Sequence, residues 1–142
     1  LDLAYAPPYS SAKDPVNIAG FMIENISKGY LKQFFWDELD TLPTDGSALL
    51  LDTRTKEEFD SGHIDGFLNI PVDELRERLG ELETGKPVYV ICQSGLRSYI
   101  ACRILMQHGF DFQNFSGGYR LYQTVALDRA ASEQALPCGK EP

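Results

Sequence analysis

Residues 87–105, PVYVICQSGLRSYIACRIL, run from an apolar segment through a glycine-containing loop into a helical pattern, and this order decides the fold. The apolar, β-branched run at 87–92 has the length of a strand that is covered on both faces. From Leu96 the apolar residues recur at helical spacing, and the pattern ends at Gly109. Cys92 therefore lies where a buried strand leads into a loop and then into the start of a helix.

The alternation of strand and helix continues on both sides of this segment. Because parallel strands need crossover connections, this spacing predicts the α/β class, with an open parallel sheet and helices on both faces. The expected strands are residues 47–53, 67–70 and 87–92 and the first part of 110–118, and the expected helices are residues 18–30, 55–62, 72–82, 96–109 and 119–127. Thr55, Glu58 and Gly62 mark the start and end of the second helix. Asp14 or Asn17 is expected near the start of the first.

The composition limits the classes of partner. The chain has 142 residues and a formal charge of −8, from 21 acidic and 13 basic side chains. This length forms one core of normal size, and the negative charge argues against nucleic acid and membrane surfaces as partners. No apolar run is long enough to cross a bilayer, and the N-terminus lacks the order of a secretory signal. We therefore expect a soluble, cytoplasmic protein.

The three cysteines, Cys92, Cys102 and Cys138, have neither the even number of a disulfide framework nor the C-x-x-C spacing of a metal site. We expect no metal and no cofactor to be bound by these residues. Cys102 shares its predicted helix with apolar neighbours and is expected to pack in the core. Cys138 falls in a polar segment and is expected to be an exposed, unactivated thiol.

The loop after Cys92 contains groups that stabilise an anion on its sulfur. In an open parallel sheet, sites form outside the carboxyl ends of the strands, where loops lead into helix N-termini. Backbone N–H groups and the positive end of the helix dipole then face the sulfur. The thiolate is the nucleophilic form of cysteine, so we predict that Cys92 is the catalytic residue. The expected active-site loop consists of Gln93, Ser94, Gly95, Leu96, Arg97 and Ser98.

Asp52 and Arg54 end a predicted strand, so both are expected at the active-site edge as supporting residues. Asp52 can orient the loop amides or pair with an arginine, and an ordinary structural salt bridge is an equally good interpretation. For Arg97, two interpretations have equal weight. It adds positive charge beside the sulfur, or it binds Glu58 as part of the scaffold.

Three other residues have simple structural interpretations. His63 follows a predicted helix, and an imidazole that bonds the backbone explains it better than proton transfer does. Gly117 and Gly118 are more typical of a turn than of ligand binding.

Three segments together resemble the rhodanese-like sulfurtransferase family. They are LLLDTRTKEEFDSGHIDGFLNIP (49–71), VYVICQSGLRSYIACRIL (88–105) and NFSGGY (114–119). The Asp-x-Arg strand end, the Gly-His-Ile-x-Gly run, the C-x-x-G-x-R-S loop and the Gly-Gly pair stand in the family's order over 33–127. The resemblance implies a rhodanese-like fold over residues 31–130 and a sulfane sulfur that Cys92 accepts as a persulfide and passes to a second nucleophile. It implies small sulfur donors and thiol acceptors as partners.

Two alternatives stay open beside sulfur transfer. The same fold carries tyrosine-phosphatase-like and arsenate reductase members, whose loops read C-x5-R. Cys92 and Arg97 have the spacing C-x4-R, and a smaller ring of amides suits a single sulfur atom better than a tetrahedral phosphate. The other alternative is a catalytically idle module that docks a partner or stabilises a parent dimer.

The first twenty residues, LDLAYAPPYSSAKDPVNIAG, resemble the end of the dimerisation domain in flavin-dependent coenzyme A-disulfide reductases and related NADH oxidases. This resemblance implies that residues 1–30 are the tail of such a domain with a linker, and residues 131–142 are expected to form a flexible tail. It implies an attached flavoprotein reductase domain in a homodimeric parent protein that uses FAD, NAD(P)H and coenzyme A. The implied substrates are coenzyme A disulfide, coenzyme A persulfide or polysulfide. By the same resemblance, Tyr5 or Tyr9 approaches the redox cysteine of a partner subunit.

Overall fold

The computed structural model describes residues 14–134, so the predictions for Tyr5, Tyr9 and Cys138 lie outside the described residues. Its helices are α1 (Pro15–Ser27), α2 (Lys56–Asp60), α3 (Leu75–Arg78), α4 (Leu96–Gln107) and α5 (Gly118–Gln134), with 3₁₀ turns η1 (Trp36–Thr41) and η2 (Leu79–Glu81). Its strands are β1 (Gln33–Phe34), β2 (Leu49–Asp52), β3 (Leu68–Asn69), β4 (Val88–Ile91) and β5 (Phe112–Phe115). Within the described range, no helix is both long and apolar enough to pass through a bilayer.

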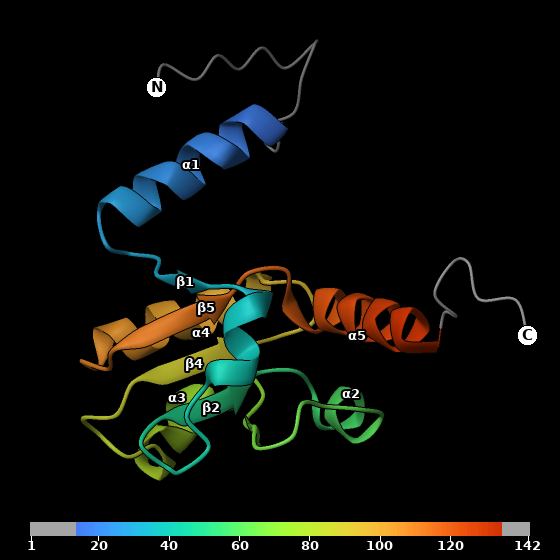
Figure 1. Cartoon of the computed structure of the whole chain (residues 1–142). Coiled ribbons are helices and arrows are strands. Elements are labelled where there is room, and N and C mark those ends of the chain that lie inside the picture. The colour runs from blue at the N-terminus through green and yellow to red at the C-terminus, as the bar shows by residue number, and fades with distance from the viewer. Residues whose placement is uncertain (1–13, 135–142) are drawn as a thin grey trace, which may run out of the picture.

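The five strands form one sheet in the order β1-β5-β4-β2-β3, and every neighbouring pair is parallel (Figure 1). This confirms the predicted α/β class and the parallel sheet. The carboxyl ends of parallel strands meet at one edge of the sheet. Asp52 at the end of β2 is the register partner of Ile91 at the end of β4, so Asp52 and Cys92 lie at the same edge.

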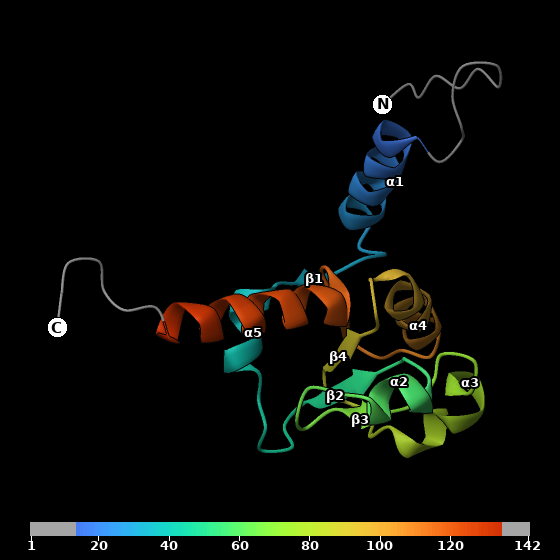
Figure 2. The same ribbon diagram turned by 90° about the vertical axis from the view of Figure 1, so that its right-hand side faces the viewer.

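Helices cover both faces of the sheet, as predicted. Alternate residues of a strand point to opposite faces. Val88 and Val90 pack in the larger buried cluster with Leu105 of α4, whereas Ile91 packs in the second cluster with Tyr119 of α5. Figure 2 shows α3 and α4 on one side of the sheet and α5 on the other. The strand that precedes Cys92 is therefore covered on both sides.

Four elements differ from the sequence prediction. The helix expected over 72–82 is the short α3 followed by the 3₁₀ turn η2, which contains Gly80, a residue that weakens an α-helix. Neither β1 nor η1 was expected. β1 has two residues and η1 has six, which is too few for a recognisable periodicity. α5 continues past the expected end at 127 to Gln134, through residues that favour helix.

α1 lies beyond one edge of the sheet, where β1 is the edge strand and β5 is its neighbour (Figures 1 and 2). Its start follows the prediction, since the Asp14 side chain accepts a hydrogen bond from the Val16 N–H at 2.9 Å. One side-chain bond links α1 to α4, where Asn25 Nδ2 donates to the Tyr99 hydroxyl at 3.3 Å. α1 thus stands next to the start of the helix that follows Cys92.

The packing of α4 predicts a large cost for Leu105→Ala. Leu105 is fully buried in the larger cluster, so the substitution is expected to lower the free energy of unfolding by about 2–5 kcal/mol. Leu127→Ala on α5 is the matched control, because Leu127 is 72% exposed and its loss is expected to cost less than about 0.5 kcal/mol. Urea unfolding followed by circular dichroism measures both. Equal costs would contradict the described packing.

Candidate active site

The sulfur of Cys92 lies inside the loop that joins β4 to α4. Cys92 is 1% exposed, and its Sγ accepts a hydrogen bond from the Gly95 N–H at 3.1 Å. The hydroxyl of Ser98 donates to the same Sγ at 3.2 Å. One donor from the loop and one from the first turn of α4 thus converge on one sulfur atom. This arrangement stabilises a negative charge on sulfur.

Gly95 gives the loop the shape that turns its amide toward the sulfur. Its φ of 109° is in the left-handed region that favours glycine, and it is the N-cap of α4. Ser98 is buried one turn into α4, and its Oγ lies 3.1 Å from the Gly95 carbonyl oxygen as well. Of the predicted loop residues, these two contact Sγ, and the Leu96 side chain is exposed.

The start of α5 holds the other side of the loop. The backbone N–H of Tyr119 donates to the Cys92 carbonyl at 2.8 Å, and that of Arg120 donates to the Gln93 carbonyl at 3.1 Å. A Cβ on Gly118 would lie 2.7 Å from both carbonyl oxygens, closer than a side chain can approach. The sequence interpretation of Gly118 as part of a turn is incomplete. Because Gly118 has no side chain, it also allows α5 to contact the loop. The Gly-Gly pair directly before a helix was the available signal.

Asp52 and Arg54, the predicted supporting residues, form a buried ion pair. Each side chain is 1% exposed, and Arg54 Nη2 and Nε donate to Asp52 Oδ2 at 2.7 and 2.9 Å. Arg54 also donates to the Gly62 carbonyl at 2.9 Å, and its guanidinium carbon lies 3.8 Å from the centre of the Tyr119 ring. Asp52 therefore pairs with an arginine. Through Tyr119, the pair contacts the start of α5, which holds the loop.

Thr53 is a further residue at this edge, and sequence reasoning missed it. Its backbone N–H and its hydroxyl both donate to the Ile91 carbonyl at 2.9 Å. Ile91 directly precedes Cys92, so these bonds fix the end of the strand that carries the nucleophile. A threonine between Asp52 and Arg54 at a predicted strand end was the signal.

Arg97 binds Glu58, which is the second of its two predicted interpretations. Arg97 Nη1 and Nη2 donate to Glu58 Oε2 and Oε1 at 2.6 and 2.7 Å. The Thr55 N–H donates to the same carboxylate at 2.9 Å, which completes the predicted cap of α2. The hydrogen bonds from Arg97 lower the pKa of Glu58 to about 2, and those to Glu58 raise the pKa of Arg97. The ion pair joins α4 to α2.

His63 and Cys102 have the structural roles that the sequence predicts. His63 Nδ1 lies 3.1 Å from the Phe59 carbonyl oxygen, and its ring stacks on that of Phe59 with centres 4.0 Å apart. Cys102 is fully buried in the larger cluster, and burial raises the pKa of its thiol. Cys102 is therefore not accessible to a ligand.

The comparisons with known proteins agree on one family. The sequence matches the rhodanese-like domain family over residues 35–124. It is similar to the solved structure of the CoADR-RHD protein of Bacillus anthracis, with 46% identity and a TM-score of 0.78 over 91% of this chain and 23% of that one. It is also similar to an NAD-dependent persulfide reductase from A. fulgidus, with 40% identity and a TM-score of 0.64 over 83% of this chain and 21% of that one. A sulfurtransferase of Allochromatium vinosum is 35% identical over 113 residues, which are 79% of this chain and 99% of the relative.

The extent of these matches differs. The chain spans less than a quarter of each reductase, and 59% and 36% of two Bacillus subtilis relatives. The match to the Bacillus anthracis structure covers 91% of the chain, so it reaches into the segment that precedes the family span of 35–124. That segment contains α1.

The contact between α5 and the loop predicts the effect of Gly118→Ala. The new methyl group displaces the loop carbonyls, so the sulfur loses hydrogen bonds and Cys92 is expected to react with iodoacetamide about tenfold more slowly at neutral pH. Gly109→Ala is the matched control, since Gly109 also has a positive φ of 79° but has nothing within 4 Å of an added Cβ. Both variants lose stability through backbone strain. Peptide mass spectrometry follows the alkylation of Cys92, and equal rates in the two variants would refute the role of Gly118.

The pairing of Glu58 predicts a pH dependence of stability. Because the folded-state pKa of Glu58 is lowered to about 2, its pairing stabilises the protein above the unfolded value of about 4.3. This contribution is lost as the pH falls through the folded value. Urea unfolding of wild type and Glu58→Gln is expected to show a difference at neutral pH that shrinks below about pH 4. A constant difference down to about pH 2 would rule out a titrating pair.

Proposed function

The chain belongs to the rhodanese-like domain family, and we propose that its Cys92 carries sulfane sulfur as a persulfide. The observation that carries this proposal is the convergence of the Gly95 N–H and the Ser98 hydroxyl on Sγ, at 3.1 and 3.2 Å. These donors are placed to stabilise negative charge on the sulfur, and a thiolate is the form of cysteine that attacks a sulfur donor. The relatives named as sulfurtransferases support the general class of reaction.

In the first half of the proposed cycle, the Cys92 thiolate attacks the outer sulfur of a donor such as thiosulfate. A bond forms between Sγ and that sulfur, the sulfur–sulfur bond of thiosulfate breaks, and sulfite leaves with the electron pair. One negative charge stays on the enzyme, now on the outer sulfur of the persulfide. The amides of the loop remain positioned to interact with it.

In the second half, the acceptor thiol gives its proton to the persulfide anion, and the acceptor thiolate that results attacks the outer sulfur of the protonated persulfide. The new sulfur–sulfur bond forms on the acceptor, and the bond to Sγ breaks with its electron pair returning to Cys92. Gly95 and Ser98 stabilise the thiolate that is released. No general acid is required at this step, in agreement with the structural role of His63.

We also propose that the domain serves an attached flavoprotein reductase that acts on coenzyme A disulfide, coenzyme A persulfide or polysulfide. The similarity to two reductase structures, one a coenzyme A-disulfide reductase with a rhodanese domain, supports this proposal. In this arrangement residues 1–30 are the tail of a dimerisation domain with a linker, and residues 31–130 are the sulfur-carrying domain. The flexible tail predicted from residue 131 is wrong at its start, because α5 continues to Gln134. FAD and NAD(P)H would supply electrons in the reductase part of a homodimer, and we assign them no step at Cys92.

Arg97 argues against the phosphatase alternative. Phosphatase-like use of the loop needs an arginine that binds the phosphate, whereas both terminal nitrogens of Arg97 bind Glu58. A phosphate would have to displace that carboxylate. The spacing of Cys92 and Arg97 is also one residue shorter than in the phosphatase-like loops.

Cys92→Ser is expected to abolish sulfur uptake. After incubation with thiosulfate or polysulfide, the intact mass of wild type is expected to increase by one sulfur atom, and that of Cys92→Ser is not. Cys102→Ala is the matched control and is expected to take up sulfur, because Cys102 is buried in the core. A wild-type protein whose Cys92 thiol stays free would contradict sulfur transfer. Hydrolysis of an aryl phosphate that depends on Cys92 would favour the phosphatase alternative instead.

A further inference from the structure

Four charged side chains at the edge of the sheet next to Cys92 form two ion pairs. Both terminal nitrogens of Arg97 bind the Glu58 carboxylate, at 2.6 and 2.7 Å. Arg54 binds Asp52 at 2.7 Å. These two guanidinium groups and two carboxylates together carry no net charge. Neither guanidinium is therefore left to balance the charge of an anionic sulfur donor.

Of these two cations, Arg97 is the one that a donor could reach. Its side chain is 30% exposed and that of Glu58 is 34% exposed, whereas that of Arg54 is 1% exposed. Arg97 is in the first turn of α4, in sequence between the two residues that bind the Cys92 sulfur. The pKa of Arg97 is raised mainly by its hydrogen bonds to Glu58, and also by the negative charge of Cys92. The guanidinium is thus within electrostatic range of the nucleophile, while Glu58 occupies it.

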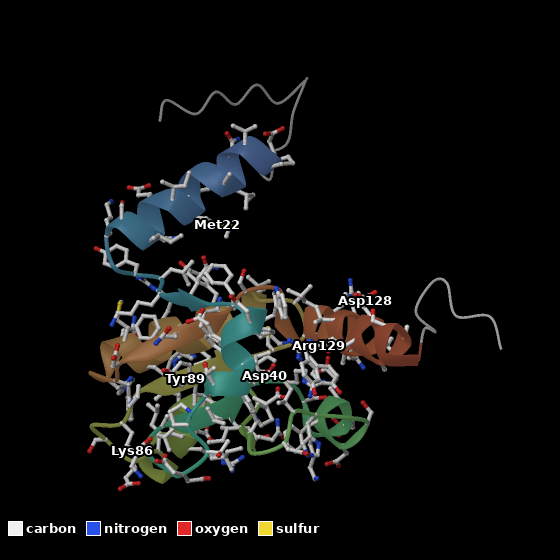
Figure 3. All side chains as sticks on the ribbon, in the orientation of Figure 1. Met22, Asp40, Lys86, Tyr89, Asp128 and Arg129 are labelled. Carbon is white, nitrogen blue, oxygen red and sulfur yellow. The ribbon has the colours of Figure 1, made fainter. Side chains whose placement is uncertain are left out.

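Basic side chains elsewhere on α4 and α5 do not replace Arg97. Arg103 is farther along α4, and its guanidinium carbon lies 4.7 Å from the centre of the Tyr30 ring. Arg129 is in the far half of α5, where it binds Asp40 at 2.9 Å (Figure 3). Arg120 is close to the loop in sequence and space, but its side chain is exposed, so water and salt screen its charge.

We propose that Glu58 determines which sulfur donors the site accepts. Its carboxylate withholds the guanidinium of Arg97 from a dianion such as thiosulfate, and it also repels that dianion. The site therefore prefers donors that carry at most one negative charge at the end from which sulfur is transferred. The inference rests on the proposed function, because it concerns the donor in the first half of the cycle. Glu58 acts through Arg97 and is a positioning residue.

Two donors of similar shape and different charge test the inference. Thiosulfate carries two negative charges, and methanethiosulfonate, with a methyl group in place of one oxygen, carries one. In both reactions Cys92 Sγ bonds to the outer sulfur, and sulfite or methanesulfinate leaves with the electron pair. Intact mass follows the rate of sulfur uptake. In Glu58→Gln, the ratio of the rate constant for thiosulfate to that for methanethiosulfonate is expected to rise about three- to tenfold, because Arg97 is released.

Two further variants show whether the effect belongs to the ion pair. Glu57→Gln is the matched control, because Glu57 is the preceding residue on α2, is exposed and lies outside the pair with Arg97. Its ratio is expected to equal that of wild type. In the double variant Glu58→Gln with Arg97→Gln, the rise is expected to disappear. An equal rise in Glu57→Gln or in the double variant would overturn the role of Glu58.

The salt dependence of the wild-type protein gives a readout that needs no variant. The chain carries a formal charge of −8, which repels thiosulfate, and salt screens this repulsion. The rate constant for thiosulfate is therefore expected to rise between about 20 and 200 mM salt. A fall would show that an unoccupied cation, such as Arg120, attracts the dianion, and it would refute the proposal.

Alkylation of Cys92 separates this inference from the proposed function. Iodoacetate carries one negative charge and iodoacetamide carries none, and neither reaction transfers sulfur. Glu58→Gln is expected to raise the ratio of the iodoacetate rate to the iodoacetamide rate about two- to fivefold, measured by peptide mass spectrometry. If Cys92 never takes up sulfur but this ratio rises, sulfur transfer fails and the control of anions by Glu58 stands. If sulfur is taken up but neither ratio changes, the proposal for Glu58 is overturned.

Discussion

The contact between the first turn of α5 and the loop of Cys92 is the constraint on which the candidate site depends. The backbone N–H groups of Tyr119 and Arg120 bind the carbonyls of Cys92 and Gln93, with no room for a side chain at Gly118. Two loop carbonyls therefore face α5, while the Gly95 N–H faces the sulfur. The orientation of these peptide groups determines which charge the loop stabilises.

The buried pair of Asp52 and Arg54 supports that contact from the sheet. Its guanidinium packs on Tyr119 and also binds the carbonyl of Gly62, so it contacts three separate parts of the chain. Buried ion pairs contribute little net stability, but removal of one partner leaves a charge without compensation. We infer that the pair matters for the arrangement of the site more than for the free energy of unfolding.

Much of this fold could be predicted from the sequence, because strong local patterns carry it. The run that ends at Cys92, the helix from Leu96 and the cap formed by Thr55 and Glu58 all follow from neighbouring residues. The short β1 and the two 3₁₀ turns could not be predicted from the sequence, because they contain too few residues for a recognisable pattern.

The contacts of the site depend on residues far apart in the sequence. The sequence alone left the partner of Arg97 open, because Glu58 is 39 positions away. The Gly-Gly pair before α5 marked an unusual backbone, but it did not show that Gly118 contacts the Cys92 loop. A cavity of about 440 Å³ is lined by residues of α1 and of β5, which are far apart in the sequence and come together only when the chain folds. The domain limits and the catalytic role of Cys92 remain predictions.

The position of the Ser98 hydroxyl between two acceptors has a consequence for the proposed cycle. A hydroxyl has one hydrogen, and this one lies within reach of both Cys92 Sγ and the Gly95 carbonyl oxygen. It can point to the sulfur while the sulfur is negative and rotate to the carbonyl when the charge moves outward. A single bond rotation then keeps this buried hydroxyl hydrogen-bonded at each stage, with no need for the backbone to rearrange or for solvent to enter.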